Sequence, residues 1–465
     1  MRRHRGTVLP KPSALSAAIA LLLVAPAASA LPAAAAVTAG IQVASHLAAM
    51  TASATTRQVT SCADAGSAGT LRAVIALAGS GDTFDLSSMP RIDPACTNST
   101  ITLSQGEIAI AHNLSLQGPG ADKLTIAAGG SNRVLYSTST DAPSGYLSVS
   151  ALTISGGKAL DGRGGCIYAK QEAILDHATV TGCDAYSSGG GKYPIAAGGG
   201  IFAGTVTLTN GSQVSRNTAT GVDFTVHTFG AGVFANSQLT CTDSTLSGNV
   251  TLLRGGGAAS AGSTSITRCT IDSNMAGYGA GLYQFGTSGT VAIHESTISG
   301  NQGGKGGGIY SKASLTIDNS TVAFNSGIAS NGGGIHSAAN IIATSSIFAR
   351  NTNSNGVNPD IVLASGKTLT GSGNLVMSIN NLPLPGVIAT SLDPRLAPLG
   401  NHGGPTRTHA LLAGSAAIDA GGNPLADASD QRGAGFAREA PAGKPDIGAY
   451  ERQPGEDEIF GNGFD

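Results

Sequence analysis

The chain has 465 residues, of which 67 are glycine, none is tryptophan, and only 12% are charged. Aromatic residues make up 4%, so large side chains cannot fill one deep globular core. The apolar content comes instead from Ala, Val, Ile and Leu, interleaved with Ser, Thr, Asn and Gly, which favours a long, thin core built from many similar turns. The net charge of −2 provides no basic stripe and argues against nucleic acid or an anionic membrane as a partner.

The N-terminus is typical of a secretory signal. Three arginines among the first five residues precede an apolar stretch at 14–25, and small residues at 28–30 form a cleavage site, with a second option at 34–36. A membrane anchor is the alternative, but the apolar stretch is short for a span, and no later segment has the length or apolarity of one. We therefore expect a removable signal peptide at 1–30, a low-complexity linker at 31–58, and no transmembrane segment in the mature chain.

Export would place the cysteines where disulfides can form. They are Cys62, Cys96, Cys166, Cys183, Cys241 and Cys269. Six cysteines allow fifteen pairings and the sequence does not choose among them, although proximity favours Cys62–Cys96 and Cys166–Cys183. No CxxC spacing occurs, so a thiolate metal site is not expected.

The strongest pattern is self-similarity at intervals of about 25 residues. Residues 291–301 (VAIHESTISGN) and 315–325 (LTIDNSTVAFN) share one frame, and a Gly-Gly-x-Ile element follows each. The frame is marked, at spacings of 32, 25, 27, 24 and 26, by Asn217, Asn249, Asn274, Asn301, Asn325 and Asn351. The glycine-rich elements begin at Gly164, Gly198, Gly230, Gly255, Gly279, Gly306 and Gly332.

Apolar residues occupy fixed positions three, eight and ten residues before these asparagines, and their period-two alternation is typical of a strand with one buried face. Such short strands, repeated every ~25 residues, cannot be hairpins. Stacked coils would pair equivalent residues of successive repeats, with a spacing of ~4.8 Å per coil. Strand twist favours a right-handed path. The sequence thus predicts an all-β fold, a right-handed parallel β-helix with nine or ten coils between about Leu147 and Val376, preceded by less regular coils at 101–152.

Two polar rows are predicted to stack in the turns. The asparagines tolerate a left-handed backbone and can bond to the copies above and below, and we favour this structural interpretation over a row of ligand-binding asparagines. Five positions earlier lie Ser212, Ser244, Cys269, Ser296, Ser320 and Ser346. The glycine-rich elements lack the following helix and Lys-Ser/Thr pair of a phosphate loop, so no nucleotide cofactor is expected.

The two ends of the repeat differ from its middle. Residues Thr70–Ala78 predict a short amphipathic helix that would cover the N-terminal edge of the coils. Five prolines between 383 and 405 interrupt strand pairing, so we expect a loop-rich cap or a chain packed along the coils. The expected organisation is a capped β-helix at 59–376, a C-terminal module at 377–455 and a short tail at 456–465.

Catalysis on such a scaffold would need carboxylates clustered on adjacent coils. Six positions before the asparagines, adjacent coils carry Asp243, Arg268, Glu295 and Asn319. The alternating signs predict a solvent-facing ion-pair ladder worth about 0.2–1 kcal/mol per pair, whereas a Ca²⁺ site would stack like charges. Asp176 and Asp318 share a register several coils apart, and His294 faces Asp318 as a single pair. We therefore assign no catalytic residue, no metal and no cofactor.

The C-terminal region is dense in polar groups, with Asp393, His402, His409, Asp419, Asp430, Arg432, Asp446 and Glu451. One interpretation is a metal or binding site. The other is a loop-rich cap, whose side chains must satisfy unpaired backbone groups. We favour the second interpretation.

Several motifs in this region resemble the C-terminal module of the choice-of-anchor Q bacterial surface proteins. They are DPRLAPLGNHGGPTRTHALL at 393–412, GSAAIDAG at 414–421, DQRG at 430–433 and DIGAYE at 446–451. The Gly-Gly-x-Ile elements, with FARN at 348–351, resemble the repeats of polymorphic outer membrane proteins, and SCAD at 61–64 with TLRA at 70–73 is similar to the N-terminal cap common in such proteins. The resemblance implies a secreted or surface-attached bacterial protein without an established reaction, with the tail as a candidate sorting signal.

Two functions remain open at this point. The first is a non-catalytic solenoid, extracellular or associated with the bacterial outer membrane, used in adhesion or in contact with extracellular polysaccharide or a host surface component. The alternative is a polysaccharide lyase or another carbohydrate-active enzyme, which rests on analogy with other β-helices alone.

Overall fold

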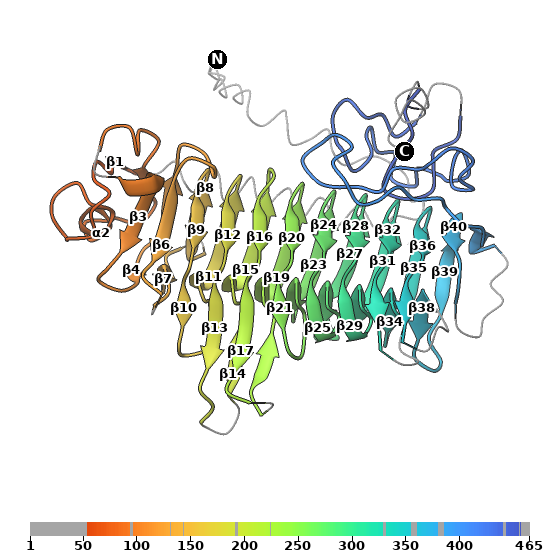
Figure 1. Ribbon diagram of the computed structural model, residues 1–465, viewed down its shortest axis with the longest axis horizontal. Helices are drawn as coiled ribbons and strands as arrows, with labels where there is room; N and C mark the ends of the chain where they lie inside the picture. Colours follow the sequence, from red (N-terminus) through yellow and green to blue (C-terminus); the bar gives the residue numbers. More distant parts are fainter. Residues whose placement is uncertain are drawn as a thin grey trace, which may run out of the picture. The chain divides into compact units, whose positions relative to one another are not determined.

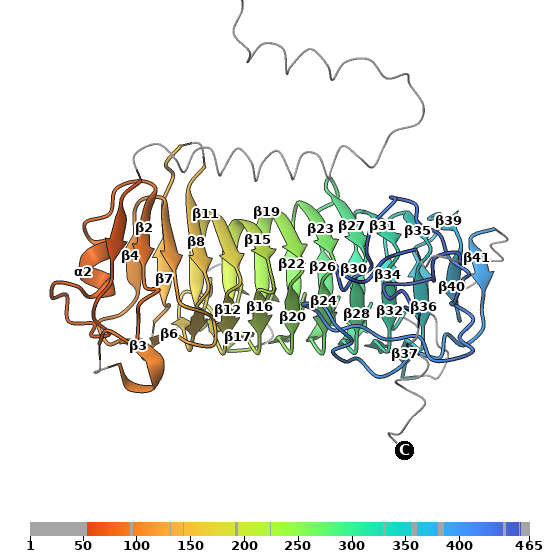
Figure 2. The same ribbon diagram turned by 90° about the horizontal axis from the view of Figure 1, so that it is seen from above.

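The computed structural model describes residues 54–454 and Glu456, apart from 94–95, 131, 143, 191–193, 224, 329–331, 355–359, 380–385 and 440–442. The expected signal peptide and the tail after Glu456 lie outside the described residues. Between Thr56 and Thr390 the chain forms stacked coils whose strands pair in parallel, as Figures 1 and 2 show. The fold is therefore the parallel β-helix that the repeat predicted.

The coils contribute strands to three long parallel sheets. The 12-stranded sheet contains β3 (Thr100–Leu103), β6 (Thr125–Ala128), β9 (Thr153–Ser155), β12 (Thr179–Thr181), β16 (Gln213–Ser215), β20 (Thr245–Ser247), β24 (Thr270–Asp272), β28 (Thr297–Ser299), β32 (Thr321–Ala323), β36 (Ile347–Ala349), β40 (Asn374–Val376) and β41 (Ile388–Thr390). The eight-stranded sheet contains β10 (Lys158–Ala159), β13 (Asp184–Ser187), β17 (Thr218–Gly221), β21 (Val250–Thr251), β25 (Met275–Tyr278), β29 (Gln302–Lys305), β33 (Ser326–Gly327) and β37 (Thr352–Asn353).

The 19-stranded sheet has two arms, which are separate strands in most coils. The first arm contains β4 (Ile108–Ile110), β7 (Leu135–Ser137), β22 (Ala258–Ser260), β26 (Leu282–Gln284), β30 (Ile309–Ser311), β34 (Ile335–Ser337) and β38 (Ile361–Leu363). The second arm contains β1 (Thr56–Gln58), β2 (Asp82–Asp85), β5 (Leu114–Gln117), β8 (Tyr146–Ser150), β23 (Ser263–Thr267), β27 (Thr290–His294), β31 (Ser314–Asp318), β35 (Ile341–Thr344) and β39 (Leu369–Ser372). Three long strands span both arms: β11 (Ile167–Asp176), β15 (Ile201–Thr209) and β19 (Val233–Thr242). A separate pair, β14 (Ile195–Ala197) and β18 (His227–Phe229), lies beside them.

The predicted register is confirmed. Ile293 pairs with Ile317 in the next coil, Ile298 pairs with Val322, and all four side chains are buried. Nine strands of the 12-stranded sheet, β9 to β40, lie between Leu147 and Val376, which agrees with the nine or ten coils expected. Because every coil presents the same apolar positions, each one buries its inner face against a nearly identical neighbour.

The asparagine row forms the predicted ladder. The side-chain amide of each asparagine donates to the side-chain oxygen of the next, with 2.9 Å between Asn274 and Asn301 and 2.8 Å between Asn301 and Asn325. The row ends on Asp360, whose carboxylate accepts from Asn351 at 2.8 Å. One detail of the prediction is wrong, because the left-handed residue is the one before each asparagine, such as Arg216 (φ 54°). The asparagine is therefore selected for its two-sided hydrogen bonding.

The ladder also explains the glycine-rich elements. A Cβ atom on Gly308 would lie 2.7 Å from the carbonyl oxygen of Gly334 and 3.1 Å from the amide of Asn325. Gly257 and Gly281 lie against Asn274 and Asn301 in the same way. The glycines thus leave room for the ladder and for the close approach of successive coils.

Two further features of the coils match their predictions. The serine row is bonded from coil to coil, since the backbone N–H of Ser296 donates to the hydroxyl of Ser320 at 3.1 Å, and Ser320 donates to Ser346 in turn at 3.1 Å. The two favoured disulfides, Cys62–Cys96 and Cys166–Cys183, are present, and the remaining cysteines form Cys241–Cys269.

The N-terminal helix is present and shorter than predicted. Helix α2 spans Leu71–Ile75, with Thr70 as its N-cap, and it buries Leu71 and Ile75 against the first coils. Figure 1 places it at the N-terminal end of the stack, where it covers the end of the core. The helix is held in place by Arg72, which bonds to Asp64 and to the carbonyl oxygen of Gly106.

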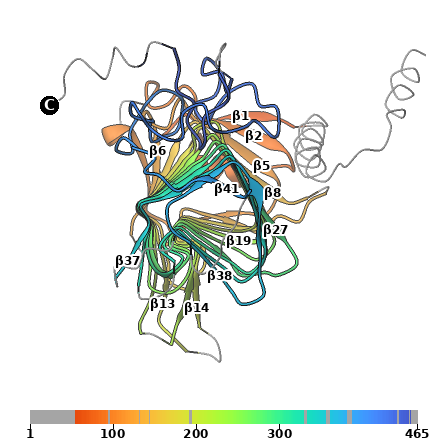
Figure 3. The ribbon, with the colours of Figure 1, turned by 90° about the vertical axis from the view of Figure 1, so that its right-hand side faces the viewer.

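The segment after Thr390 is loop-rich, as predicted, and lies along the coils. Its residue Gln431 accepts a hydrogen bond from Thr297 at 2.6 Å, and His409 lies 2.8 Å from the hydroxyl of Ser299. In Figures 1 and 3 this C-terminal segment covers one side of the solenoid, whereas β13, β14 and the first-arm strand β38 lie on the opposite side. The solenoid therefore has one covered side and one open side.

Candidate functional site

The predicted charge ladder is only partly correct. Arg268 and Asp243 do form a partly exposed pair with both guanidinium bonds below 3 Å (2.7 and 2.8 Å). Glu295, however, is 1% exposed and pairs with Arg438 of the C-terminal segment, with two bonds of 2.9 Å. Asn319 is fully buried and donates to the carbonyl oxygen of Gly422. The ladder does not face solvent over these coils because the C-terminal segment covers it.

His294, Glu295 and Asp427 bring potential ligand atoms within 4.8 Å of one another on this covered side. The Nε2 atom of His294 lies 2.8 Å from Asp427. Burial raises the pKa of Asp427, but its interactions, chiefly with His294, outweigh this effect, so the pKa lies below its ordinary value. Both Glu295 oxygens are already bonded to Arg438, so a metal ion would have to compete with that guanidinium. We interpret the group as a polar contact that holds the C-terminal segment on the coils.

The polar residues of the C-terminal segment mostly satisfy its backbone. Asp430 accepts from the N–H groups of Arg432 and Glu451, and Asp446 accepts from those of Asp419 and Arg452. Burial, together with the charge of Asp446, raises the pKa of Glu451 to about 8. This is the arrangement expected of irregular chain, whose backbone groups have no strand partner.

His402 and Asp393 lie closer to the surface of this segment. His402 is half-buried beside Thr408, and burial lowers its pKa. Asp393 forms an exposed ion pair with Arg350 of the coils. Each of these interactions attaches a loop of the segment, either to its own chain or to the coils.

The candidate catalytic carboxylates are not brought together. Asp176 pairs in register with Thr209 of the next coil, and Asp318 pairs with His294 of the preceding one. Burial raises the pKa of Asp318, and the charge of His294 opposes that shift. Both members of the predicted His294–Asp318 pair thus belong to the covered side.

A row of aromatic side chains follows the open side along the first arm of the 19-stranded sheet, with one ring in each coil from Tyr136 to His336 except the coil of Ala259. We call this row the aromatic stripe, and its members are Tyr136, Tyr168, Phe202, Phe234, Tyr283, Tyr310 and His336. Neighbouring rings stack with centroids 4.9 to 5.4 Å apart within each half of the stripe. In β30 the flanking Ile309 and Ser311 are fully buried, so Tyr310 between them points outward. The stripe is therefore an external surface of the solenoid.

The stripe is continuous across a coil that lacks a ring in register. Ala259 pairs with Phe234 on one side and with Tyr283 on the other. Phe285 covers this gap, with its ring 5.8 Å from Phe234 and 6.0 Å from Tyr283, and Phe229 of β18 contacts it at 5.7 Å. The central rings are consequently well buried, while the outer members of the stripe remain half-buried.

Two basic side chains lie over rings of the stripe, and two lie over the neighbouring rings of Phe229 and Tyr278. The guanidinium carbon of Arg133 is 5.0 Å from the centroid of Tyr136, that of Arg163 is 5.6 Å from Phe202, and that of Arg254 is 5.1 Å from Phe229. Lys305 lies 6.0 Å from Tyr278 beside the stripe. Such contacts are cation–π interactions, which place positive charge at the edge of an aromatic surface.

Only the first of these cations is neutralised by acids. Arg133 is bonded to Glu107 and Asp161. Among the described residues, Arg163, Arg254 and Lys305 form no salt bridge with a carboxylate. The stripe therefore carries unbalanced positive charge over most of its length.

A groove of about 410 Å³ adjoins the stripe where β13 and β14 extend beyond the other coils (Figure 1). Its walls include Arg163, which also lies over Phe202, and Ile195, which packs against the aromatic cluster. The remaining lining is largely polar and small, with Asp161, Ser187 and Ser188. The groove and the stripe thus form one continuous surface.

Burial among the rings affects the titration of the stripe. It raises the pKa of Tyr310 and of Tyr283, and the charge of Arg254 opposes the shift at Tyr283. Burial also lowers the pKa of His336, with a further contribution from the charge of Lys305. All three rings are accordingly neutral near pH 7, and His336 stacks on Tyr310 with an angle of 5° between the rings.

The sequence contained a signal for the stripe that the register of the asparagines did not use. Each glycine-rich element has a buried apolar residue at its fourth position, and the stripe residue is the fifth, as in GGCIY, GGGIF, GAGVF, GAGLY and GGGIY. Because a strand alternates its faces, the residue after a buried position points outward. Comparing the fifth positions of successive elements would have found the row.

The fold defines the class of protein as a parallel β-helix solenoid. The chain matches no protein-family model, and neither a curated protein nor a solved structure is significantly similar to it. In the described part of the chain, no helix combines the length and the apolar character that a membrane crossing requires.

Proposed function

We propose that this chain is an extracellular or surface-associated solenoid that binds a linear polysaccharide along the aromatic stripe, without catalysing its cleavage. The observation that carries the proposal is the row of outward-facing rings with unpaired cations beside it. Because the rings stack on one another, the half-buried members, such as Tyr168 and Tyr310, expose ring edges, and these edges together form an apolar strip against which the C–H groups of a sugar can pack. One ring per coil would present a repeating polymer with a repeating row of contacts.

The cations favour an acidic glycan. Arg163, Arg254 and Lys305 have no carboxylate partner among the described residues and lie beside the rings. Carboxylates or sulfates on the polymer would pair with these groups, and guanidinium groups bind such anions through paired hydrogen bonds. Binding should accordingly weaken as salt is added.

An extracellular location is part of this proposal. The pattern of residues 1–30 supports export, and the pairing of all six cysteines in disulfides suits an oxidising compartment. The motifs between 393 and 451 support a relationship to choice-of-anchor Q surface proteins. Attachment to the bacterial surface follows from that relationship and is proposed with it.

The test measures binding of the purified chain to soluble polysaccharides, both acidic (pectate, alginate, a glycosaminoglycan) and neutral, by calorimetry at two salt concentrations. Replacing Tyr168 and Tyr310 by Ala should weaken binding of an acidic polymer about tenfold or more, which corresponds to roughly 1.4 kcal/mol or more. The matched control is Tyr186→Ala, because Tyr186 is also half-buried and has Lys158 5.1 Å from its ring, but it lies on β13 outside the stripe.

A purely structural stripe would give a different result. In that case Tyr310→Ala would destabilise the solenoid as much as Tyr186→Ala does, and neither change would alter binding. The same incubations, assayed for unsaturated sugar products, test the enzymatic alternative. Release of such products by the wild-type chain would overturn the non-catalytic assignment.

A further inference from the structure

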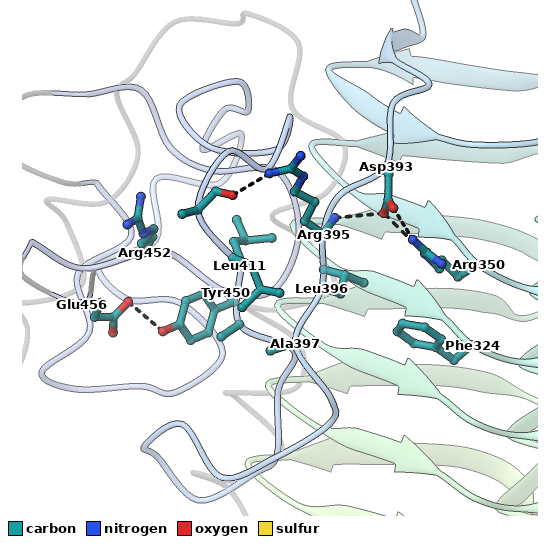
Figure 4. A pocket seen from close by; sticks show the side chains of 13 residues that line it. Phe324, Arg350, Asp393, Arg395, Leu396, Ala397, Leu411, Tyr450, Arg452 and Glu456 are labelled. Atoms are coloured by element: carbon teal, nitrogen blue, oxygen red, sulfur yellow. Dashed lines mark hydrogen bonds and ion pairs between the residues drawn. The ribbon is translucent and has the colours of Figure 1, made fainter. Parts of the chain in front are cut away.

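A cavity of about 690 Å³ lies between the C-terminal segment and the coils, within the size range of ligand sites. Figure 4 shows its apolar wall, formed by Phe324, Leu396, Ala397 and Leu411. Phe324 and Leu412, which also lines the cavity, are 40% and 43% exposed, so apolar surface remains uncovered here. This cavity is separate from the aromatic stripe, which lies on the open side.

The rim of the cavity is basic. Arg350, Arg395 and Arg452 line it together with two acids, Asp393 and Glu456. Both acids are engaged, Asp393 by Arg350 and Glu456 by Arg432 from outside the cavity. Arg395 donates to the carbonyl oxygen of Ala413 and forms no salt bridge within the described chain. A ligand with both acidic and apolar groups would match this lining.

The chain itself carries such a segment immediately beyond the cavity wall. Glu456 lines the cavity and is held by Arg432 at 3.0 Å and by the hydroxyl of Tyr450 at 2.7 Å. The sequence then continues Asp457-Glu458-Ile459-Phe460-Gly461-Asn462-Gly463-Phe464-Asp465. Ile459 and Phe460 follow Glu456 by three and four residues, a reach of at most about 10–14 Å for extended chain.

We propose that residues 457–465 dock in this cavity, with Ile459 and Phe460 against the apolar wall and the acidic residues near Arg395 and Arg452. The short tether favours this occupant over a free ligand, because a tethered group reaches effective concentrations of roughly millimolar. Docking would cover Phe324 and Leu412 and would tie the C-terminal segment to the coils. The candidate sorting segment would then be sheltered until something displaces it.

The experiment uses the full chain with benzoyl-phenylalanine placed at position 460 and photo-crosslinking read out by mass spectrometry. The proposal expects intramolecular crosslinks to residues 395–413, Phe324 or Tyr450. A variant carrying Arg395→Glu should reduce these crosslinks at least several-fold, and added salt should reduce them as well. The matched control is Arg216→Glu, since Arg216 is also exposed and has φ near that of Arg395 (54° and 46°) but lies in a distant coil.

Hydrogen exchange gives a second measurement that does not depend on the photo-crosslinker. Ile459→Ser combined with Phe460→Ser should speed exchange at the amides of Ala397 and Leu412 and leave the coils unchanged. Crosslinks that scatter over the surface, that join two copies of the chain, or that do not form would overturn the proposal. Exchange at Ala397 and Leu412 unchanged by the double variant would overturn it too.

Discussion

The coils from Gln213 to Ala349 and the segment after Thr390 bury polar groups in opposite ways. Inside the coils most buried polar groups are neutral amides and hydroxyls, such as Asn301 and Ser320, each bonded to its copy in the next coil. The C-terminal segment adds ion pairs that have no copies, either across its contact with the coils, as Arg438 with Glu295, or within itself, as Arg432 with Asp430, and all four side chains are almost completely buried. Repetition allows neutral ladders, whereas a single irregular segment relies on specific charge pairs.

This difference determines what a substitution costs. Removing one amide from a ladder leaves a few neutral hydrogen bonds unmade, and the coils on either side keep their own contacts. Removing one partner of a buried ion pair leaves a charge in a medium that solvates it poorly. The C-terminal segment should therefore be the more sensitive of the two regions.

The largest effect is expected for Arg438→Met. Glu295 and Glu451 would then lose their buried cation, which costs roughly 3–5 kcal/mol. Denaturant unfolding and limited proteolysis should show a C-terminal segment that detaches before the coils unfold. Adding Glu295→Gln should restore part of the loss, since it removes one of the unpaired charges.

The control for this change is Arg268→Met, from the partly exposed pair of the same charge row. That pair should contribute no more than about 1 kcal/mol because water already screens it. Equal losses for Arg268→Met and Arg438→Met would contradict the distinction between partly exposed and buried ion pairs.

The next effect concerns the pH dependence of the C-terminal segment. Burial lowers the pKa of His409 to about 4, and the neutral ring contacts Ser299 and the carbonyl oxygen of Ala397. In the unfolded chain His409 binds a proton below about pH 6.5. The contribution of His409 to the free energy of unfolding is therefore fully present above that pH and is lost as the pH falls through about 4.

His409→Asn removes this titration and can keep the donor to Ala397. The stability of the wild type minus that of the variant should rise by about 3 kcal/mol between pH 4 and pH 6.5, then level off. Because the opposite titration of Glu451 is common to both chains, it cancels in the difference. Denaturant titrations at four pH values would measure it, and a constant difference would rule out a buried neutral His409.

The smallest effect is expected in the ladder. Asn301→Ala removes the acceptor of the backbone N–H of Asn274 and of one side-chain amide bond of Asn274, and it removes the donor to the carbonyl oxygen of Ile271. The cost should be roughly 1–3 kcal/mol, seen as a lower denaturant midpoint for the coils. Asn236→Ala, at an exposed position of β19, should change stability by no more than about 0.5 kcal/mol. A loss at Asn301 as small as at Asn236 would mean that the ladder does not stabilise the stack.

The predictions made from the sequence succeeded where the chain repeats. The buried positions of Ile293 and Ile298 and the Asn301 ladder follow from comparing one coil with the next. The prediction failed at Glu295, which looked like a rung of an exposed ladder. Its true partner, Arg438, lies 143 residues away in a segment without a repeat, so no periodic pattern could have indicated the contact.

The aromatic stripe lies between these two cases. Its residues repeat, so the sequence contained the row, but only the fold shows that the row is on the open side. Tyr310 and Glu295 both point outward from their coils. One remains half-buried at the surface, and the other is covered by the C-terminal segment.

The sequence by itself determined the coil, its register and its internal ladders, because every coil packs against a near copy of itself and the same residues must meet at every step. Only the tertiary structure decided which outer positions are covered and which stay accessible. The reason is that the covering segment occurs once, and its contacts depend on long-range charge pairing that local periodicity does not encode.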